Sequence, residues 1–353
     1  MDSAKKAGIL SYDECIARRT GPNPDSPLAE AHRPAWTHLY LAVTSRLEFE
    51  SVFARGHKNA LVSYYYLRSM LKKYKTLGEF FKAYGWPMEG CRIMVDSGAY
   101  SAKTLGVNLP IEEYIDFVKA NIEYISVPIM MDAVLDPVST RYNYELHKKS
   151  GIRFMSAFHR PEPWNFFDAF TEDSDYIGLA PMPKSTSNVK IEWFQKAQAR
   201  AAERHKFSGR APQYHLLGST SEKVMMEMDA VSTDSSSWAI GAKSFVTTKS
   251  PFGATCWSVK TDNPNHWTKH SADKKQLVRD WLLAVCELTP EILLDCQAKW
   301  SNHKRARVNV EYMKWLEDRS NVHKQLHGVH KPRFQDLDYL VVDNKQMKDT
   351  PWS

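Results

Sequence analysis

The sequence predicts an α/β protein in which eight parallel strands close into a (β/α)8 TIM barrel, with an added C-terminal helical, basic region. Eight short apolar runs alternate with longer stretches of helical composition, the pattern of parallel strands joined by helices. These units occupy about 210 residues, close to the length that one barrel needs. An open doubly wound sheet is the alternative, but it usually carries a glycine-rich phosphate turn, and this sequence has none.

The eight runs are short, mostly continuous, and rich in β-branched or aromatic residues, as expected of strands buried on both faces. They span residues 38–45, 60–67, 92–96, 124–132, 152–159, 176–181, 213–218 and 230–234. Between them, residues 111–123 and 189–207 have helical composition, and Pro110 suits the start of the first helix. We therefore expect three parts, which are an N-terminal extension (1–35), the barrel (36–251) and a C-terminal extension packed on the barrel (252–353).

The C-terminal extension has a different pattern. Residues 272–319 look helical, with Pro290 near the start of a second helix. The stretch from Lys299 to Arg333 contains nine basic and three acidic residues, and this excess equals the whole net charge of +6. Two interpretations stay open, a solvated helix face and tail or a surface that tracks phosphates.

Composition places the chain among ordinary globular proteins. Apolar residues make up 43% and charged residues 25%, which excludes collagen-like and disordered classes. The longest apolar stretch is interrupted by Asp132 and is too short to span a bilayer. The N-terminus lacks the basic-then-apolar order of a secretion signal. The five scattered cysteines form no CxxC pair and predict reduced thiols in a cytoplasmic protein; they are Cys15, Cys91, Cys256, Cys286 and Cys296.

Acidic side chains end three of the predicted strands, namely Asp96, Asp132 and Asp234. His159 ends the fifth run, and His215 lies in the seventh. In an α/β barrel, residues at the carboxyl ends of the strands line the active mouth. Each carboxylate alone is as well explained as a helix cap. Three that converge would raise the pKa of at least one, which places an acid beside an anion.

An acid beside an anion is what glycosyl chemistry requires, because one carboxylate attacks or stabilises the anomeric carbon while another moves the proton. Aromatic neighbours suit a planar leaving group: Tyr100 follows Asp96 closely, and Tyr64–Tyr66 end the second run. The alternative for these tyrosines is core filling. The sequence contains no P-loop, GxSxG, HExxH or dinucleotide motif.

A metal site has only weak candidates. His266 and His270 form an HxxxH pair with Cys256 upstream, and further ligands could come from Cys286, Cys296 or His303. This spacing matches no established zinc motif, and surface histidines with buried thiols are the alternative. A structural zinc is therefore possible, and no cofactor is required by the chemistry.

With these residues laid out, the chain resembles the transglycosylases that exchange guanine for a 7-deazaguanine in nucleic acid. It is most similar to the phage branch that acts on DNA (DpdA-like), and more distantly similar to tRNA-guanine transglycosylases. The resemblance runs from about residue 36 to residue 248. It rests on five segments in family order: VDSGAYS (95–101), IMMDAVLDP (129–137), IGLAP (177–181), HLLG (215–218) and STDSSSW (232–238).

The resemblance implies roles for individual residues. Asp234 matches the nucleophile that attacks C1′ and forms a covalent glycosyl–enzyme intermediate, and Asp96 matches the general acid and base. Tyr100 and Leu217 match residues on the two faces of the base, and Asp132 matches the carboxylate that reads its N–H edge. The remaining expected substrate-binding residues are Ser97, Gly98, His159, Gly178, Leu179, His215 and Gly218.

The lead hypothesis is an enzyme, a pentosyltransferase that exchanges guanine in DNA for preQ0 or a related base. DNA and the 7-deazaguanine base are the expected partners, and the basic C-terminal extension would help hold the polyanion. The CxCxxC…H zinc site of the tRNA enzymes is absent, and Ser235–Trp238 replace their Pro-Thr-Arg segment. These departures favour DNA over tRNA. A tRNA-guanine (queuine or archaeosine) transglycosylase, a non-catalytic nucleic-acid-binding barrel and a carbohydrate hydrolase remain as alternatives.

Overall fold

Eight parallel strands form one continuous sheet in the structure, a computed structural model that describes residues 37–53, 55–86, 91–133, 136–207, 212–243, 248–258, 261–295 and 301–329. The strand order is β4-β3-β2-β1-β8-β7-β6-β5, so the first strand pairs with the last. The strands are β1 (His38–Val43), β2 (Asn59–Ser63), β3 (Arg92–Asp96), β4 (Val127–Pro128), β5 (Ser156–His159), β6 (Tyr176–Ala180), β7 (Gln213–Leu216) and β8 (Ser232–Ser235). The expected N-terminal extension lies outside the described residues.

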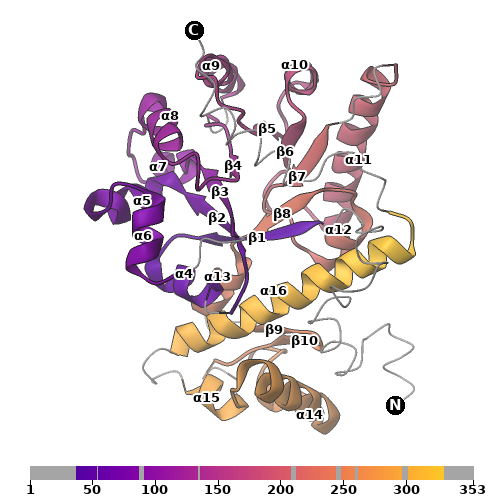
Figure 1. Ribbon diagram of the computed structural model, residues 1–353. Helices are drawn as coiled ribbons and strands as arrows, with labels where there is room; N and C mark the ends of the chain where they lie inside the picture. The colour runs from indigo at the N-terminus through magenta and orange to yellow at the C-terminus, as the bar shows by residue number, and fades with distance from the viewer. Residues whose placement is uncertain are drawn as a thin grey trace, which may run out of the picture.

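A single parallel bridge joins the outer strands of this order, β4 and β5. Ile129 lies opposite Met155. The Met155 N–H donates to the Pro128 carbonyl at 2.8 Å, and the Met130 N–H donates to the Met155 carbonyl at 3.0 Å. Helices follow the strands in turn and lie outside them (Figure 1). The predicted fold class is therefore confirmed as TIM-barrel-like, with its weakest pairing between β4 and β5.

The helices around the barrel bury one face each. In α8 (Ile111–Ala120), the buried side chains are Ile111, Tyr114, Ile115 and Val118, which is the spacing of one helix face. The helices are α4 (Arg46–Phe53), α5 (Tyr64–Met70), the 3₁₀ turn η1 (Leu71–Lys73), α6 (Leu77–Ala83), α7 (Ala99–Thr104), α8, α9 (Pro137–Lys149), α10 (Trp164–Asp173), α11 (Ser187–Arg204), α12 (Glu222–Glu227) and α13 (Ser237–Lys243). Residues 189–207 thus form a helix largely as expected.

The second predicted run is wrong at its carboxyl end. The sequence predicts a strand to residue 67, but β2 ends at Ser63 and α5 begins at Tyr64. The Tyr65 N–H, in the first turn of α5, donates to the Ser97 carbonyl at 3.2 Å, just after β3. Consecutive tyrosines favour a strand in isolation, and tertiary contacts override that preference here.

The fourth run is much longer in the sequence than in the sheet. Of residues 124–132, only Val127 and Pro128 belong to the strand. Pro128 has no N–H to donate, which shortens any ladder through it. Ile129 and Met130 still donate their N–H groups to the carbonyls of Val95 and Met155, and the chain then leaves the sheet and carries Asp132 into the mouth of the barrel.

The C-terminal extension packs on the barrel through one long helix. A hairpin of β9 (Thr248–Ser250) and β10 (Gly253–Thr255) crosses the expected boundary at residue 252. The extension continues with the 3₁₀ turn η2 (Trp267–Lys269), α14 (Ala272–Trp281), the π-helical turn η3 (Leu282–Cys286), α15 (Pro290–Leu294) and α16 (Ser301–Leu326). Helix α16 lies against α4, α12 and α13, and separates the barrel from the hairpin, α14 and α15 (Figure 1). The helical prediction is confirmed here, whereas the hairpin was not predicted.

Side chains of α16 hydrogen-bond the backbone at the start of β1. The Asn321 side-chain oxygen accepts from the Thr37 N–H at 2.7 Å, and its amide donates to the Thr37 carbonyl at 3.0 Å. Glu317 accepts from the Leu39 N–H at 2.8 Å. Lys324, which is fully buried, donates to the Thr37 hydroxyl at 2.6 Å. The pairing of β1 with β2 begins only at Leu41, so α16 satisfies backbone groups that the sheet leaves open.

Most described cations of the basic C-terminal stretch are engaged inside the protein. Arg305 is 1% exposed and donates to the Ala242 carbonyl at 3.1 Å. Arg319 pairs with Glu222 at 3.0 Å. Lys299, Lys331 and Arg333 lie outside the described residues. The charge excess noted in the sequence therefore serves largely to attach α16, which leaves fewer cations for a polyanion than the pattern indicated.

We expect Asn321→Ala to destabilise the protein by about 1–3 kcal/mol, because the variant leaves a buried N–H and carbonyl of Thr37 without partners. Urea denaturation followed by circular dichroism measures the effect. Lys304→Ala, at a half-exposed position of the same helix, is the control and should change stability by less than about 0.5 kcal/mol. Equal stability of the two variants would contradict the role given to Asn321.

Candidate active site

Three carboxylates lie at the carboxyl end of the barrel. Asp96 is the last residue of β3, Asp234 lies in β8, and Asp132 follows β4 by four residues. The negative charges of Asp132 and Asp234 both act on Asp96, so the three share one mouth. His159, the last residue of β5, joins them there and also senses the charge of Asp96.

Asp96 is poised between its protonated and ionised forms near neutral pH. Burial and the negative charge of Asp132 raise its pKa from 3.8 to about 7, and Asp234 adds to the rise. The N–H groups of Gly98 and Ser97 donate hydrogen bonds to the carboxyl group and partly offset this rise in pKa. A carboxyl group with this pKa can both donate and accept a proton under physiological conditions.

The turn after β3 requires a glycine. Gly98 has φ of +77°, and a Cβ there would lie 2.2 Å from the Ser63 hydroxyl oxygen and 2.5 Å from the Tyr65 Cβ. The close approach brings the end of β2 against the Asp96 turn, and Ser63 pairs with Asp96 in the sheet register. Ser97 is fully buried, so this turn holds the carboxyl group in place instead of offering the Ser97 side chain to solvent.

Asp132 and His159 form an ion pair across the mouth, with 3.1 Å between Asp132 Oδ2 and His159 Nε2. Burial lowers the pKa of His159, but the contact with Asp132 and the charges of Asp132, Glu162 and Asp96 outweigh burial and raise it above 6.5. Glu162 accepts from the His159 N–H at 3.0 Å. The pair places a carboxylate acceptor beside an imidazolium donor.

Asp234 is held by two donors on one oxygen. Its Oδ1 accepts from the Gly218 N–H at 2.7 Å and contacts His215 Nε2 at 3.1 Å. Both donors come from β7 and the turn after it, where Gly218 has φ of +58°. Among the described residues, no hydrogen bond is made to Oδ2, so both contacts of this carboxylate fall on Oδ1.

A buried chain of hydrogen bonds continues from His215 into the barrel. His215 Nδ1 lies 2.5 Å from the Ser232 hydroxyl, which contacts the Tyr176 hydroxyl in turn. A carboxylate can only accept, so Nε2 carries the proton toward Asp234 and Nδ1 accepts from Ser232. His215 has no exposed surface, so it lies deeper in the barrel than Asp234, and its Nε2 contact orients that carboxylate.

The other expected substrate residues surround this centre. Tyr100 lies in the first turn of α7 and is 69% exposed, which leaves its ring available for stacking. A Cβ on Gly178 would lie 3.1 Å from Leu217 Cδ1, so the missing side chain lets Leu217 lie over β6. The Leu179 side chain is fully buried, and its carbonyl accepts from the Leu217 N–H at 3.0 Å.

Three residues near the carboxylates were not singled out from the sequence. The Tyr114 hydroxyl bridges the carbonyls of Val95 and Ile129, at 2.9 and 2.7 Å, and thereby joins β3 to the end of β4. Ser232 lies two residues before Asp234 on the same strand, a spacing that could have placed it on the same face. Burial lowers the pKa of Lys190, on α11, which is close enough to Asp234 for the negative charge of that residue to offset part of this effect. Nothing in the local sequence distinguishes Lys190 from a surface lysine.

The zinc candidates do not assemble among the described residues, where no group of three or more His, Cys, Asp or Glu side chains is arranged for a metal. The two ring nitrogens of His266 contact the Thr268 hydroxyl and the Ser258 carbonyl, each at 2.8 Å. His303 contacts the Leu47 carbonyl at 3.1 Å. Cys296 lies outside the described residues.

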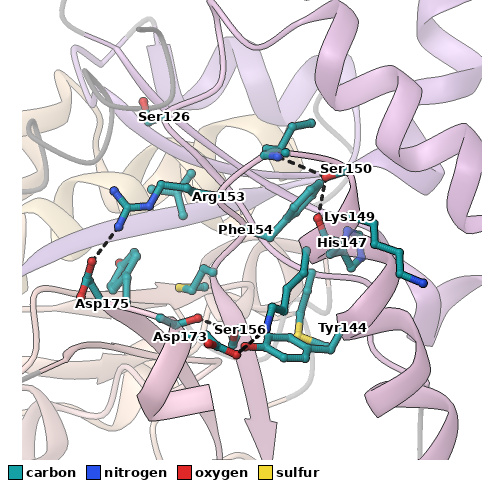
Figure 2. A pocket seen from close by; sticks show the side chains of 18 residues that line it. Ser126, Tyr144, His147, Lys149, Ser150, Arg153, Phe154, Ser156, Asp173 and Asp175 are labelled. Carbon is teal, nitrogen blue, oxygen red and sulfur yellow. Dashed lines mark hydrogen bonds and ion pairs between the residues drawn. The ribbon is translucent and has the colours of Figure 1, made fainter. Parts of the chain in front are cut away.

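A cavity of about 620 Å³ lies at the opposite, amino end of β4, β5 and β6 (Figure 2). Four of its charged lining residues form two ion pairs, since Arg153 contacts Asp175 at 2.6 Å and Lys148 contacts Asp173 at 2.8 Å. None of the three strand-end carboxylates lines it. The cavity and the carboxyl-end mouth are therefore separate features of the barrel.

Comparisons with known proteins add no relative. No protein-family model matches the chain, and neither the curated proteins nor the solved structures yield a match. Within the described ranges, no helix has the length and apolarity needed to span a membrane. Evidence about function therefore comes from the three strand-end carboxylates and their neighbours alone.

Replacing Asp96 tests the pKa that burial gives it. The folded protein keeps this proton up to about pH 7, whereas the unfolded chain loses it near 3.8, so stability falls as pH rises through that window. We expect Asp96→Asn to be more stable than wild type at pH 8 by about 2 kcal/mol, after discounting for solvent screening. Below pH 4 this difference should vanish.

Denaturation curves from pH 4 to pH 8 measure this effect. Asp116→Asn, on an exposed position of α8, is the control and should follow the wild-type curve. If Asp96→Asn left the pH dependence unchanged, the raised pKa of Asp96 would be refuted.

Proposed function

We propose that this protein is a DNA-guanine transglycosylase that replaces guanine with a 7-deazaguanine base, through a covalent bond between Asp234 and the sugar. One observation carries the proposal. A carboxyl group with a pKa of about 7, Asp96, shares a mouth with Asp234, a carboxylate that two donors hold from one side. Such a pair separates the proton-transfer role from the nucleophilic role.

In the first displacement, Asp234 attacks C1′ of the nucleoside. The bond between C1′ and the purine breaks, its electron pair goes to the purine, and the departing base takes the proton of Asp96. Guanine is a poor leaving group, so protonation during bond cleavage lowers the barrier. The products of this step are free guanine, ionised Asp96 and an ester between Asp234 and the sugar.

In the second displacement, the incoming 7-deazaguanine gives a proton to Asp96, and its nitrogen attacks C1′. Asp234 leaves as a carboxylate, and Asp96 regains its proton. Two displacements preserve the anomeric configuration, and the ester keeps the sugar while one base leaves and another enters. Both half-reactions use only groups that the mouth contains.

The Asp132–His159 pair supports selection of a guanine-like base. Guanine presents a carbonyl oxygen beside two N–H groups on its pairing edge. The imidazolium of His159 can donate to that carbonyl, and the carboxylate of Asp132 can accept from the N–H groups. Both features are shared by guanine and 7-deazaguanines, so one pocket can accept the leaving and the entering base.

Aromatic and cationic groups at the rim support a nucleic acid as the carrier of that base. Tyr100 is exposed beside the Asp96 turn, and Arg68 lies over the Tyr65 ring at 5.0 Å near the end of β2. Exposed aromatic rings stack on unpaired bases, and nearby cations attract phosphates. A base inside a duplex would have to leave the stack to reach the carboxylates.

Asp234→Asn should lower guanine exchange by more than about a thousandfold, because an amide is no nucleophile toward C1′. Asn keeps the acceptor that Gly218 and His215 use, so the fold should be retained. The measurements are release of labelled guanine from DNA and a denaturant-stable protein–DNA adduct. Asp262→Asn, at an exposed position, is the control. Exchange retained by Asp234→Asn would eliminate Asp234 as the nucleophile.

Labelled guanine offered with DNA or with tRNA distinguishes the two nucleic acids. We expect incorporation into DNA, preferentially into single-stranded regions, because unstacking costs less there. Incorporation confined to tRNA would reject DNA as the substrate and retain the reaction. Tight binding of DNA without exchange would identify a non-catalytic barrel instead.

A further inference from the structure

Lys190 places a half-buried ammonium group beside the nucleophile, although it belongs to a different strand–helix unit. It lies in the second turn of α11, the helix that follows β6, and its Nζ lies 3.5 Å from the Ser219 hydroxyl in the loop after β7. That loop also supplies the Gly218 N–H that holds Asp234. Among the described residues, no carboxylate forms an ion pair with Lys190.

This environment is costly for a cation without a partner. Burial lowers the pKa of Lys190, and the negative charge of Asp234 opposes that effect. A buried ammonium group gains most from an anion at close range. The hydroxyl groups of Ser187 and Ser221, 2.8 Å apart, border the same junction between α11 and the loop.

The proposed reaction supplies such an anion. When Asp234 becomes an ester with the sugar, it loses its negative charge, and Lys190 loses the anion that offsets its burial. The phosphates on either side of that sugar are then the nearest anions that the substrate brings. A cation at this position would hold the sugar in the mouth while one base leaves and another enters.

We propose that Lys190, with the hydroxyl groups of Ser219 and Ser221, binds one of the two phosphodiesters that flank the nucleoside whose base is exchanged. The ligand chemistry is a nucleic-acid phosphate, from DNA if the proposed function is correct. The assignment of the flanking phosphate rests on that function. Phosphate binding itself does not require that exchange occurs.

Binding of a short fluorescent single-stranded DNA tests the proposal, measured by anisotropy with no free base present. Lys190→Gln should bind about fivefold more weakly at about 0.1 M salt, because one counterion fewer is released. The slope of log affinity against log salt should fall by about 0.7, the value for a single strand. Lys196→Gln is the matched control, since Lys196 lies on the same helix over the Trp164 ring and should bind like wild type.

A neutral methylphosphonate placed at each linkage in turn identifies the contact. One linkage beside the target guanosine should weaken wild type by the same factor as Lys190→Gln, and should cost Lys190→Gln nothing further. Unchanged affinity and salt slope in Lys190→Gln would overturn the proposal. So would equal losses in wild type and variant at every linkage, because Lys190 would then contact none of them.

Exchange assays on the same variants separate this proposal from the function on which it rests. We call a linkage coupled to Lys190 when its methylphosphonate weakens wild type but not Lys190→Gln. Coupling at one linkage without any guanine exchange would retain the phosphate site and reject the proposed reaction. Guanine exchange without coupling at any linkage would retain the reaction and reject the phosphate site. The same scan on an RNA oligonucleotide identifies the source, because coupling found only with RNA would keep the phosphate site and reject DNA. Equal melting temperatures of wild type and Lys190→Gln would confirm that the binding loss is local.

Discussion

The chemistry available at the mouth of this barrel depends on the raised pKa of Asp96. Burial is the main cause of that rise, and repulsion from neighbouring carboxylates adds to it. Water would screen Asp96 from Asp132, but a partly closed mouth does not, so the protein favours a proton on Asp96 up to neutral pH. The Gly98 and Ser97 N–H groups limit this effect and keep the pKa in a useful range. The fold thus produces an acid from an ordinary aspartate by position alone.

Asp132 and Asp234 each have donors of their own. Asp132 faces His159, whose pKa the contact raises, and Asp234 receives the Gly218 N–H and the His215 ring. The three carboxylates therefore differ in their hydrogen-bond partners. A fold-level likeness to a barrel cannot establish such differences, since many unrelated reactions use this architecture.

Periodicity predicted the barrel well, because strands buried on both faces leave continuous apolar runs that survive any detail of packing. It failed where the local preference and the tertiary contacts disagree, as at Tyr64, where a strand-like run turns into α5 against the Asp96 turn. The residue types at strand ends also predicted which carboxylates would gather. Lys190 could not be found this way, because its importance comes from a loop that follows another strand.

The burial of His215 is a second feature that the sequence pattern does not provide. This expected substrate-binding residue near the end of β7 is fully buried, and its ring contacts Asp234 and Ser232, which contacts Tyr176 in turn. Only the alternation of the strands and the register between β7 and β8 bring these groups into line. The role of such a residue depends on depth within the barrel, which a linear pattern does not encode.

The attachment of α16 to β1 links parts of the chain that are 284 residues apart. During synthesis, the first strand leaves the ribosome long before the helix that satisfies its open backbone groups. Until α16 has been made, water must hydrogen-bond the backbone groups at the start of β1. Completion of the carboxyl-end mouth, which includes the neighbouring β8, is in this way coupled to the arrival of a helix that attaches at the start of β1.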